Sequence, residues 1–170
     1  KFQDEAKRSQ ENTKTFNAVT DRSRSAKQNL QLVRDMADVL VAPEQDKETQ
    51  KEFWTQDMIW HGPPGFGDVH GLAAFKQQVL STFYGAFPDY YGEIDIGLAD
   101  ENWVAATGFV TGTHRGDWLG IPATGKPVKM RYSDFWLVRD GKLAENWVMI
   151  DHIGVLRQMG VDPLAGKFEE

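Results

Sequence analysis

The stretch Val128–Asp151, with the sequence VKMRYSDFWLVRDGKLAENWVMID, decides the fold of this chain. Its first half alternates with a period of two, which is typical of a β-strand whose side chains point in turn to two opposite faces. The pair Asp140-Gly141 then predicts a two-residue hairpin turn, because both residues tolerate the positive φ angles that a type I′ turn needs. The stretch therefore predicts two antiparallel strands, Val128–Val138 and Leu143–Asp151.

Asp134 lies on the apolar face of the first of these strands. The same face carries Val128, Met130, Tyr132, Trp136 and Val138. Burial among such side chains disfavours the charged form of a carboxyl group and raises its pKa, so that the group can exchange protons near neutral pH. From spacing alone, a buried structural acid that is hydrogen-bonded to a neighbour explains Asp134 equally well.

A regular register from the turn predicts that Asp134 pairs with Trp147. The inward face of the hairpin would then combine aromatic and apolar side chains with three acids: Tyr132, Trp136, Trp147, Met149, Asp134, Glu145 and Asp151. This composition suits a ligand cavity better than a solid core. Two alternatives stay open: the aromatic residues could be ordinary core, and Glu145 and Asp151 could lie at exposed strand ends.

Composition limits the classes of protein to which the chain can belong. Its 170 residues, 41% of them hydrophobic, suffice for one globular domain with an appendage. The formal charge of −6 provides no basic stripe, which argues against nucleic acid or an anionic membrane surface as a partner and favours a small neutral or weakly polar ligand. The absence of cysteine removes disulfides, thiolate metal sites and cysteine nucleophiles.

No segment is apolar enough to cross a bilayer, so the sequence predicts a cytoplasmic protein. The chain begins at Lys1, and a cleaved upstream signal stays open. The four histidines show no helix-spaced pair, and we therefore expect no metal site.

The pattern along the chain predicts a polar arm, then helices, then strands. Residues 1–24 contain too few apolar side chains for a core and form the arm, and residues 25–170 form the domain. The expected helices are a helix from Ser25 that ends before Pro43, Asp46–Trp54, Gly71–Phe87 and His152–Met159. The expected strands are Met58–His61, Tyr90–Leu98 and Trp103–His114, besides the two strands of the hairpin.

Helices followed by antiparallel strands predict an α+β layered fold. Gly108 and Gly112 interrupt the strand Trp103–His114, and glycine inside a strand usually marks a bulge, a bend or the close approach of another segment. We therefore expect a strongly curved sheet, wrapped around helices, with an internal pocket lined by the inward residues of the hairpin.

Several ordered motifs also carry a family resemblance. They are Trp60-His61-Gly62-Pro63, Phe87-Pro88-Asp89, Thr113-His114-Arg115-Gly116, Leu119–Lys126, Arg131–Trp136, Asp140-Gly141-Lys142 and Glu145-Asn146-Trp147. Together they resemble the SnoaL-like polyketide cyclases, also called ester cyclases, over roughly residues 26 to 162. The resemblance implies a cone of curved, mixed sheet and helices around a pocket, as in the nuclear transport factor 2 (NTF2) and ketosteroid isomerase group.

The resemblance also implies a chemistry. The founding enzymes of the family close a ring by intramolecular aldol condensation without metal or organic cofactor, and an aspartate serves as acid and base. That aspartate falls on Asp134 and the family's pocket histidine on His114. His114 follows a strand, and the long loop after it leaves its direction open.

The expected substrate-binding residues surround these two. Trp60, Tyr132, Trp136 and Trp147 would hold a flat polycyclic substrate, with Glu145 and Asp151 on the same face. His61 could reach the pocket mouth or cap the Gly-Pro turn. By analogy with related folds, we expect a homodimer formed through an exposed sheet face.

Three functional hypotheses follow. The first is a cofactor-free cyclase acting on a small hydrophobic keto ester. The second keeps the pocket but changes the reaction to isomerisation, dehydration or hydrolysis, because one fold hosts many reactions. The third is a small-molecule-binding domain without enzymatic activity.

Overall fold

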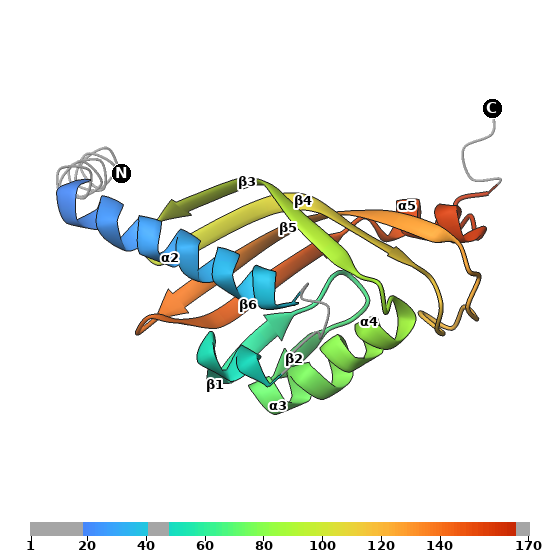
Figure 1. The fold of residues 1–170 in the computed structure, drawn as a ribbon, viewed down its shortest axis with the longest axis horizontal. Helices are drawn as coiled ribbons and strands as arrows, with labels where there is room; N and C mark the ends of the chain where they lie inside the picture. Colours follow the sequence, from blue (N-terminus) through green and yellow to red (C-terminus); the bar gives the residue numbers. More distant parts are fainter. Residues whose placement is uncertain (1–18, 41–47, 166–170) are drawn as a thin grey trace, which may run out of the picture.

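The computed structural model describes residues 19–40 and 48–165 and has helices at both ends of one sheet (Figure 1). The strands are β1 (Trp54–His61), β2 (Asp68–His70), β3 (Tyr91–Asp100), β4 (Trp103–Thr113), β5 (Pro127–Arg139) and β6 (Lys142–Ile150). The helices are α2 (Val19–Leu40), the 3-10 turn η1 (Thr49–Glu52), α3 (Leu72–Ala74), the π-helical η2 (Phe75–Leu80), α4 (Ser81–Ala86) and α5 (His152–Met159).

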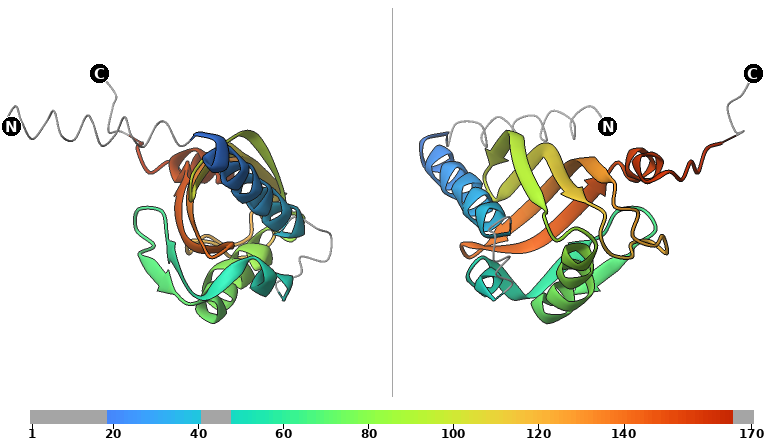
Figure 2. Two further views of the ribbon diagram at one scale, coloured as in Figure 1. Left: turned by 90° about the vertical axis from the view of Figure 1, so that its left-hand side faces the viewer. Right: turned by 45° about the vertical axis from the view of Figure 1, so that its right-hand side comes forward.

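The six strands form one mixed sheet in the order β2-β1-β6-β5-β4-β3. Only β1 and β6 pair in parallel, and the other neighbours are antiparallel. The sheet curves, and α2 together with the helical stretch α3 to α4 lies on its concave side (Figure 2). The expected α+β cone is confirmed, and the sheet is open, with β2 and β3 at its edges.

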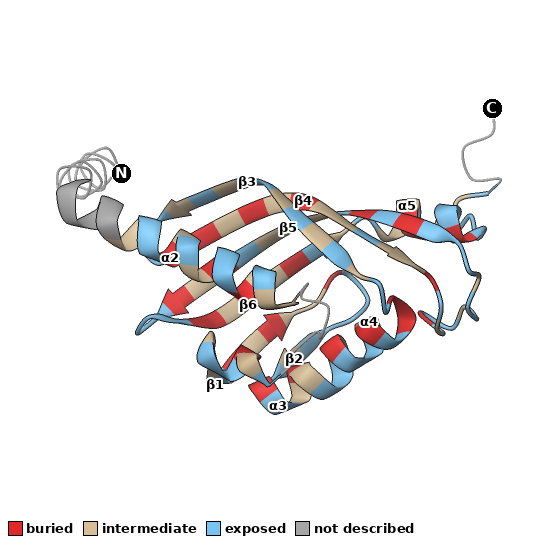
Figure 3. Cartoon of the chain, viewed as in Figure 1, coloured by how far each residue is buried: buried red, intermediate tan, exposed pale blue. Residues whose placement is uncertain are grey.

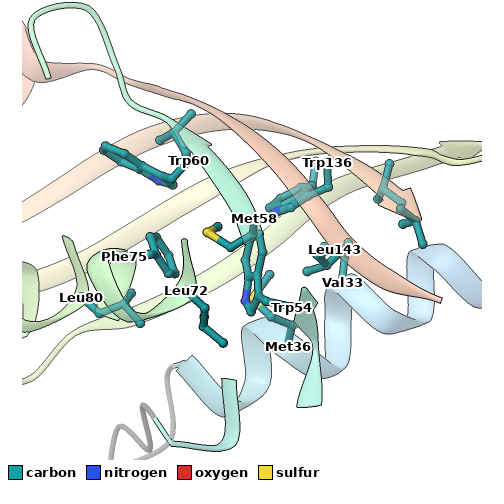
Figure 4. Close-up of a cluster of buried hydrophobic side chains, with 14 of the residues drawn as sticks. Val33, Met36, Trp54, Met58, Trp60, Leu72, Phe75, Leu80, Trp136 and Leu143 are labelled. Atoms are coloured by element: carbon teal, nitrogen blue, oxygen red, sulfur yellow. The ribbon is translucent and has the colours of Figure 1, made fainter. Parts of the chain in front are cut away.

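The core fills the space between the concave face and the helices. Trp54 and Met58 of β1 are 1% and 0% exposed and pack with Val33 and Met36 of α2 and with Trp136 of β5 (Figure 4). Burial of a side chain of this size contributes about 1.5–3 kcal/mol to stability. Burial alternates along β4 and β6, as expected for a sheet with one face packed and the other exposed (Figure 3).

Most expected elements are present, with changes at their ends. Helix α2 begins at Val19, inside the expected arm, whereas residues 1–18 lie outside the described residues. The expected helix Asp46–Trp54 is reduced to the turn η1 within the described residues 48–54. Trp54 instead opens β1. Its ring is buried in the core, and its indole N–H donates to the Gln50 side chain over 3.0 Å. Strand β2 was not expected.

The glycines of β4 allow the close approach that the sequence predicts. A Cβ on Gly108 would collide with the backbone carbonyl of Glu93 on β3, where the β3–β4 register shifts between Ile94 and Ile96. A Cβ on Gly112 would lie 3.2 Å from the Cβ of Phe87. Gly108 therefore allows β4 to lie close to β3, and Gly112 allows it to lie close to Phe87.

The Asp140-Gly141 turn is confirmed, with φ angles of 51° and 74°. The predicted register is confirmed for the pairs Arg139–Lys142 and Val138–Leu143. It is wrong beyond them, because the next residue of β5, Leu137, pairs with Glu145 and not with Ala144. Ala144 is the extra residue of a β-bulge, and one extra residue turns every later side chain of β6 to the other face. Asp134 consequently pairs with Val148, and the inward residues of β6 are Asn146, Val148 and Ile150.

Candidate active site

A cavity of about 180 Å³ lies between the concave face of the sheet, α2 and the helical stretch α3 to α4. Its walls are almost entirely apolar and aromatic. They are formed by Met36, Ala37, Leu40, Trp54, Trp60, Phe75, Val79, Leu80, Phe83, Tyr84, Tyr90, Gly92, Ile94, Val110, Tyr132, Asp134, Trp136, Asn146, Val148 and Ile150. An apolar cavity with a few polar groups is the usual form of a small-molecule site.

Asp134 is the only carboxylate among these lining residues. Its removal from water raises its pKa from the usual 3.8 to about 7, while the Asn146 side chain and the backbone N–H of Met149 act in the opposite direction. The Oδ1 atom of Asp134 is buried and has no hydrogen-bond partner among the described residues. A carboxyl group with a pKa near 7 can take up and release a proton near neutral pH.

Three tyrosines add hydroxyl groups to the cavity wall. The Tyr84 hydroxyl donates to the backbone carbonyl of Leu40 over 3.1 Å, and the Tyr132 hydroxyl donates to that of Glu93 over 3.0 Å. Burial raises the pKa of Tyr84 and of Tyr90, and it raises the pKa of Tyr132 to about 12. All three therefore remain neutral donors at physiological pH.

The expected ring-holding residues Trp60, Tyr132 and Trp136 do line the cavity. Trp60 packs against Phe75 with ring centroids 6.3 Å apart. The indole N–H of Trp136 is buried and finds no hydrogen-bond acceptor in the part of the chain that the structure describes. These side chains give the cavity flat walls on the sheet side.

His114 does not line this cavity. It follows the end of β4, whereas Asp134 pairs with Ala106 inside that strand. Its ring is fully buried, packs 5.5 Å from the Phe87 ring, and accepts the backbone N–H of Thr124 at Nδ1 over 3.3 Å. The structure therefore separates the two residues that the resemblance pairs in catalysis.

The outer face of the sheet holds His61, Glu145 and Trp147. The two ring nitrogens of His61 lie 3.1 Å from the Asp68 carboxylate and 3.2 Å from the Glu145 carboxylate, and the ring stacks on Trp147 at 4.6 Å. The expected inward position is thus wrong for Glu145 and Trp147, and the bulge at Ala144 is the reason. His61 likewise lies outside the cavity wall.

Asp151 does not line the cavity as expected but lies at the start of α5. Its carboxylate accepts the backbone N–H of Gly154 over 2.8 Å and caps the first turn of α5. Aspartate is a preferred N-cap residue because its oxygen satisfies one of the free N–H groups at a helix start.

Asn146, Tyr84 and Tyr90 are cavity residues that the sequence reasoning missed. The sequence holds a signal for Asn146 in the adjacent apolar residues Leu143 and Ala144, because a regular strand with one buried face alternates apolar and polar side chains. Both residues are buried in the structure. An extra residue at that point would have predicted the inward positions of Asn146, Val148 and Ile150. Tyr90 follows the Phe87-Pro88-Asp89 motif directly.

The curved open sheet, the helices on its concave side and the acid inside an apolar cavity define the NTF2-like class of α+β proteins. Residues 30–159 match the SnoaL-like polyketide cyclase family, and the chain belongs to that family. It is similar to the aklanonic acid methyl ester cyclase DauD of Streptomyces sp. (strain C5), with 28% identity over 110 residues. That match covers 64% of this chain and 65% of DauD.

Solved structures show the same fold. Wild-type IdmH from Streptomyces antibioticus superimposes with a TM-score of 0.68 and 26% identity, covering 78% of this chain and 99% of IdmH. A SnoaL-like polyketide cyclase from Agrobacterium tumefaciens superimposes with a TM-score of 0.63 and 21% identity, covering 76% of this chain and 95% of that protein.

Within residues 19–40 and 48–165, no three His, Asp or Glu side chains are grouped so as to hold a metal ion. No helix in that part of the chain has the length and apolar composition needed to span a bilayer.

Proposed function

We propose that this protein closes a ring in a polyketide-like keto ester by an intramolecular aldol reaction. The observation that carries the proposal is Asp134, a carboxyl group with a pKa of about 7 and an unpaired oxygen inside an apolar cavity. Family membership and the similarity to a methyl ester cyclase supply the substrate class.

Asp134 would serve first as base and then as acid. Its carboxylate takes a proton from the acidic carbon between two carbonyl groups, and the resulting enolate carbon bonds to a ketone carbon of the same molecule. The ketone oxygen becomes an alkoxide and takes the proton back from Asp134, so the product is an isomer of the substrate. A general base is most effective when its pKa lies near the working pH, which the pKa of about 7 satisfies.

The cavity walls would position the substrate. Trp60, Tyr132 and Trp136 offer flat surfaces for fused rings, and the apolar lining excludes water from the enolate. His114 was the other expected proton donor. Because it lies outside the cavity, the proposed reaction returns the proton through Asp134 alone.

Product analysis tests the reaction class. The purified protein is incubated with a panel of aromatic β-keto esters, and products are analysed by mass spectrometry and carbon NMR. Ring closure gives a product of unchanged mass in which a ketone carbon has become an alcohol carbon. Gain of water indicates hydrolysis, loss of water indicates dehydration, and unchanged mass with all carbonyl carbons retained indicates isomerisation; each of these would reject the aldol proposal.

We propose that the protein forms a homodimer through the outer face of the sheet. Large apolar side chains are exposed there on three neighbouring strands: Leu98 is 65% exposed on β3, Trp103 46% on β4 and Phe135 46% on β5. These three also line a shallow groove on that face. A contiguous apolar surface of this kind favours association with a second copy of the chain.

We also propose a cytoplasmic location, which can be tested by fractionation of cells that express the full-length gene.

A further inference from the structure

The cavity contains a tyrosine hydroxyl with no assigned hydrogen-bond partner. Among the described residues, Tyr84 and Tyr132 donate their hydroxyl protons to backbone carbonyls. Tyr90 is half-buried and lines the same cavity, and none of the hydrogen bonds among the described residues involves its hydroxyl. A hydroxyl in the wall of a ligand cavity that donates to no protein group is available to a bound molecule.

The surroundings of Tyr90 fix its protonation state. Its ring packs against Phe83 with centroids 5.2 Å apart and against Tyr84 at 6.0 Å. Burial raises the pKa of Tyr90, and the charges of Tyr84, Tyr132 and Asp134 raise it further. The hydroxyl therefore keeps its proton at physiological pH and lies within electrostatic range of Asp134.

The proposed reaction needs such a donor. When a base removes a proton next to a carbonyl group, negative charge gathers on the carbonyl oxygen, and an apolar wall gives that charge no stabilisation. Asp134 itself is the only carboxylate of the lining, and the lining contains no lysine, arginine or histidine. A neutral hydrogen-bond donor in the wall would supply the missing stabilisation without adding a charge.

We propose that the Tyr90 hydroxyl donates a hydrogen bond to the substrate oxygen that becomes the enolate oxyanion when Asp134 removes the proton. The inference rests on the proposed function and assigns a hydrogen-bond donor to the carbonyl oxygen next to the acidic carbon. Tyr90 keeps its own proton throughout, and the transferred proton moves only between the substrate and Asp134.

Kinetics of matched tyrosine variants give the first test. Tyr90→Phe removes a hydroxyl without a partner, so it should lower kcat about 100-fold, the usual effect of losing one oxyanion donor, without lowering the melting temperature. Tyr84→Phe removes a hydroxyl that is already bonded to the Leu40 carbonyl, so it should lower the melting temperature and affect kcat much less. Equal kcat values for the two variants would overturn the inference.

Binding of an enolate mimic gives a second test that needs no turnover. In the Asp134→Asn protein, 4-nitrophenol is titrated by its visible absorbance, which reports only the ionised form. The Tyr90 donor should favour the bound phenolate, and adding Tyr90→Phe should weaken phenolate binding about tenfold or more, whereas adding Tyr84→Phe should weaken it much less. Failure of Asp134→Asn to bind the phenolate, or equal effects of the two substitutions, would overturn the inference.

The two tests separate the inference from the proposed function. If no keto ester is cyclised but phenolate binding depends on Tyr90, the donor assignment stands and the reaction is wrong. If cyclisation depends on Asp134 but not on Tyr90, the reaction stands and the donor assignment is wrong. Trp136→Phe, which removes the other unpaired donor of the wall, is included because loss of phenolate binding in that variant alone would transfer the role to the indole N–H.

Discussion

The side chain of Asn146 on β6 interacts with the buried carboxyl group of Asp134 on the neighbouring strand β5. Asn146 is 3% exposed, and its amide N–H also donates to the backbone carbonyl of Phe135 over 3.2 Å. It lowers the pKa of Asp134, although desolvation has the larger effect and the net shift is upward. Desolvation by the cavity wall and the contact with Asn146 thus together set the pKa of Asp134 near 7.

Replacement of Asn146 should shift this balance. Asn146→Leu keeps the branching of the side chain and removes the polar contact, so the pKa of Asp134 should rise above its present value of about 7. The rate of the catalysed reaction should then fall at neutral pH and recover at higher pH. The midpoint of the pH–rate profile measures the shift, and an unchanged midpoint would show that Asn146 does not tune the carboxyl group.

Stability provides a second measure of Asp134. Because its folded pKa of about 7 exceeds the ordinary 3.8, the folded state binds the proton more tightly, and the stability contribution is lost as pH rises between these values. The total loss is about 4 kcal/mol. The amide side chain that Asp134→Asn introduces cannot ionise. The free energy of unfolding of this variant should therefore rise relative to that of the wild type by about this amount between pH 4 and pH 8.

Chemical denaturation of both proteins across that pH range measures the difference. Taking the difference removes the contributions of the other carboxyl groups, which both proteins share. A difference that stays constant with pH would mean that Asp134 has an ordinary pKa in the folded protein.

The fold was largely predictable because the strand patterns and the Asp140-Gly141 turn are local signals. Asp134, Trp60, Tyr132 and Trp136 reach the cavity because their positions on β5 and β1 depend only on strand alternation. The β6 residues were misplaced because a bulge at Ala144 reverses alternation, and a bulge follows from packing that a regular register ignores. The direction of His114 depends on the loop packing around Phe87 and Thr124, which no local pattern specifies.

The His61 and Glu145 pair gives a prediction about the outer face. Their side chains are 23% and 22% exposed and their closest atoms are 3.2 Å apart. Partly exposed ion pairs contribute little, so Glu145→Gln should cost less than about 1 kcal/mol in stability. Its kcat should stay near the wild-type value because Glu145 is not part of the cavity wall. A loss of kcat comparable to that of Asp134→Asn would contradict the outward placement of Glu145.

The proposed dimer can be tested at Leu98. Leu98→Asp places a charge in the most exposed apolar position of the outer face, and it should convert the dimer to a monomer with little loss of monomer stability. Glu93→Gln on the same strand serves as a control for changes of charge outside the apolar groove. Analytical ultracentrifugation measures both variants, and a monomeric wild type at micromolar concentration would contradict the proposal.

The most direct test of the central claim compares the cyclisation rate of the wild-type protein with that of Asp134→Asn on one aromatic β-keto ester across pH 5 to 9. We predict that the wild-type rate rises with a midpoint near pH 7 and that Asp134→Asn loses about 100-fold or more of the rate and the midpoint with it. A variant that is folded and cyclises the ester at the wild-type rate would contradict the assignment of Asp134 as the acid and base.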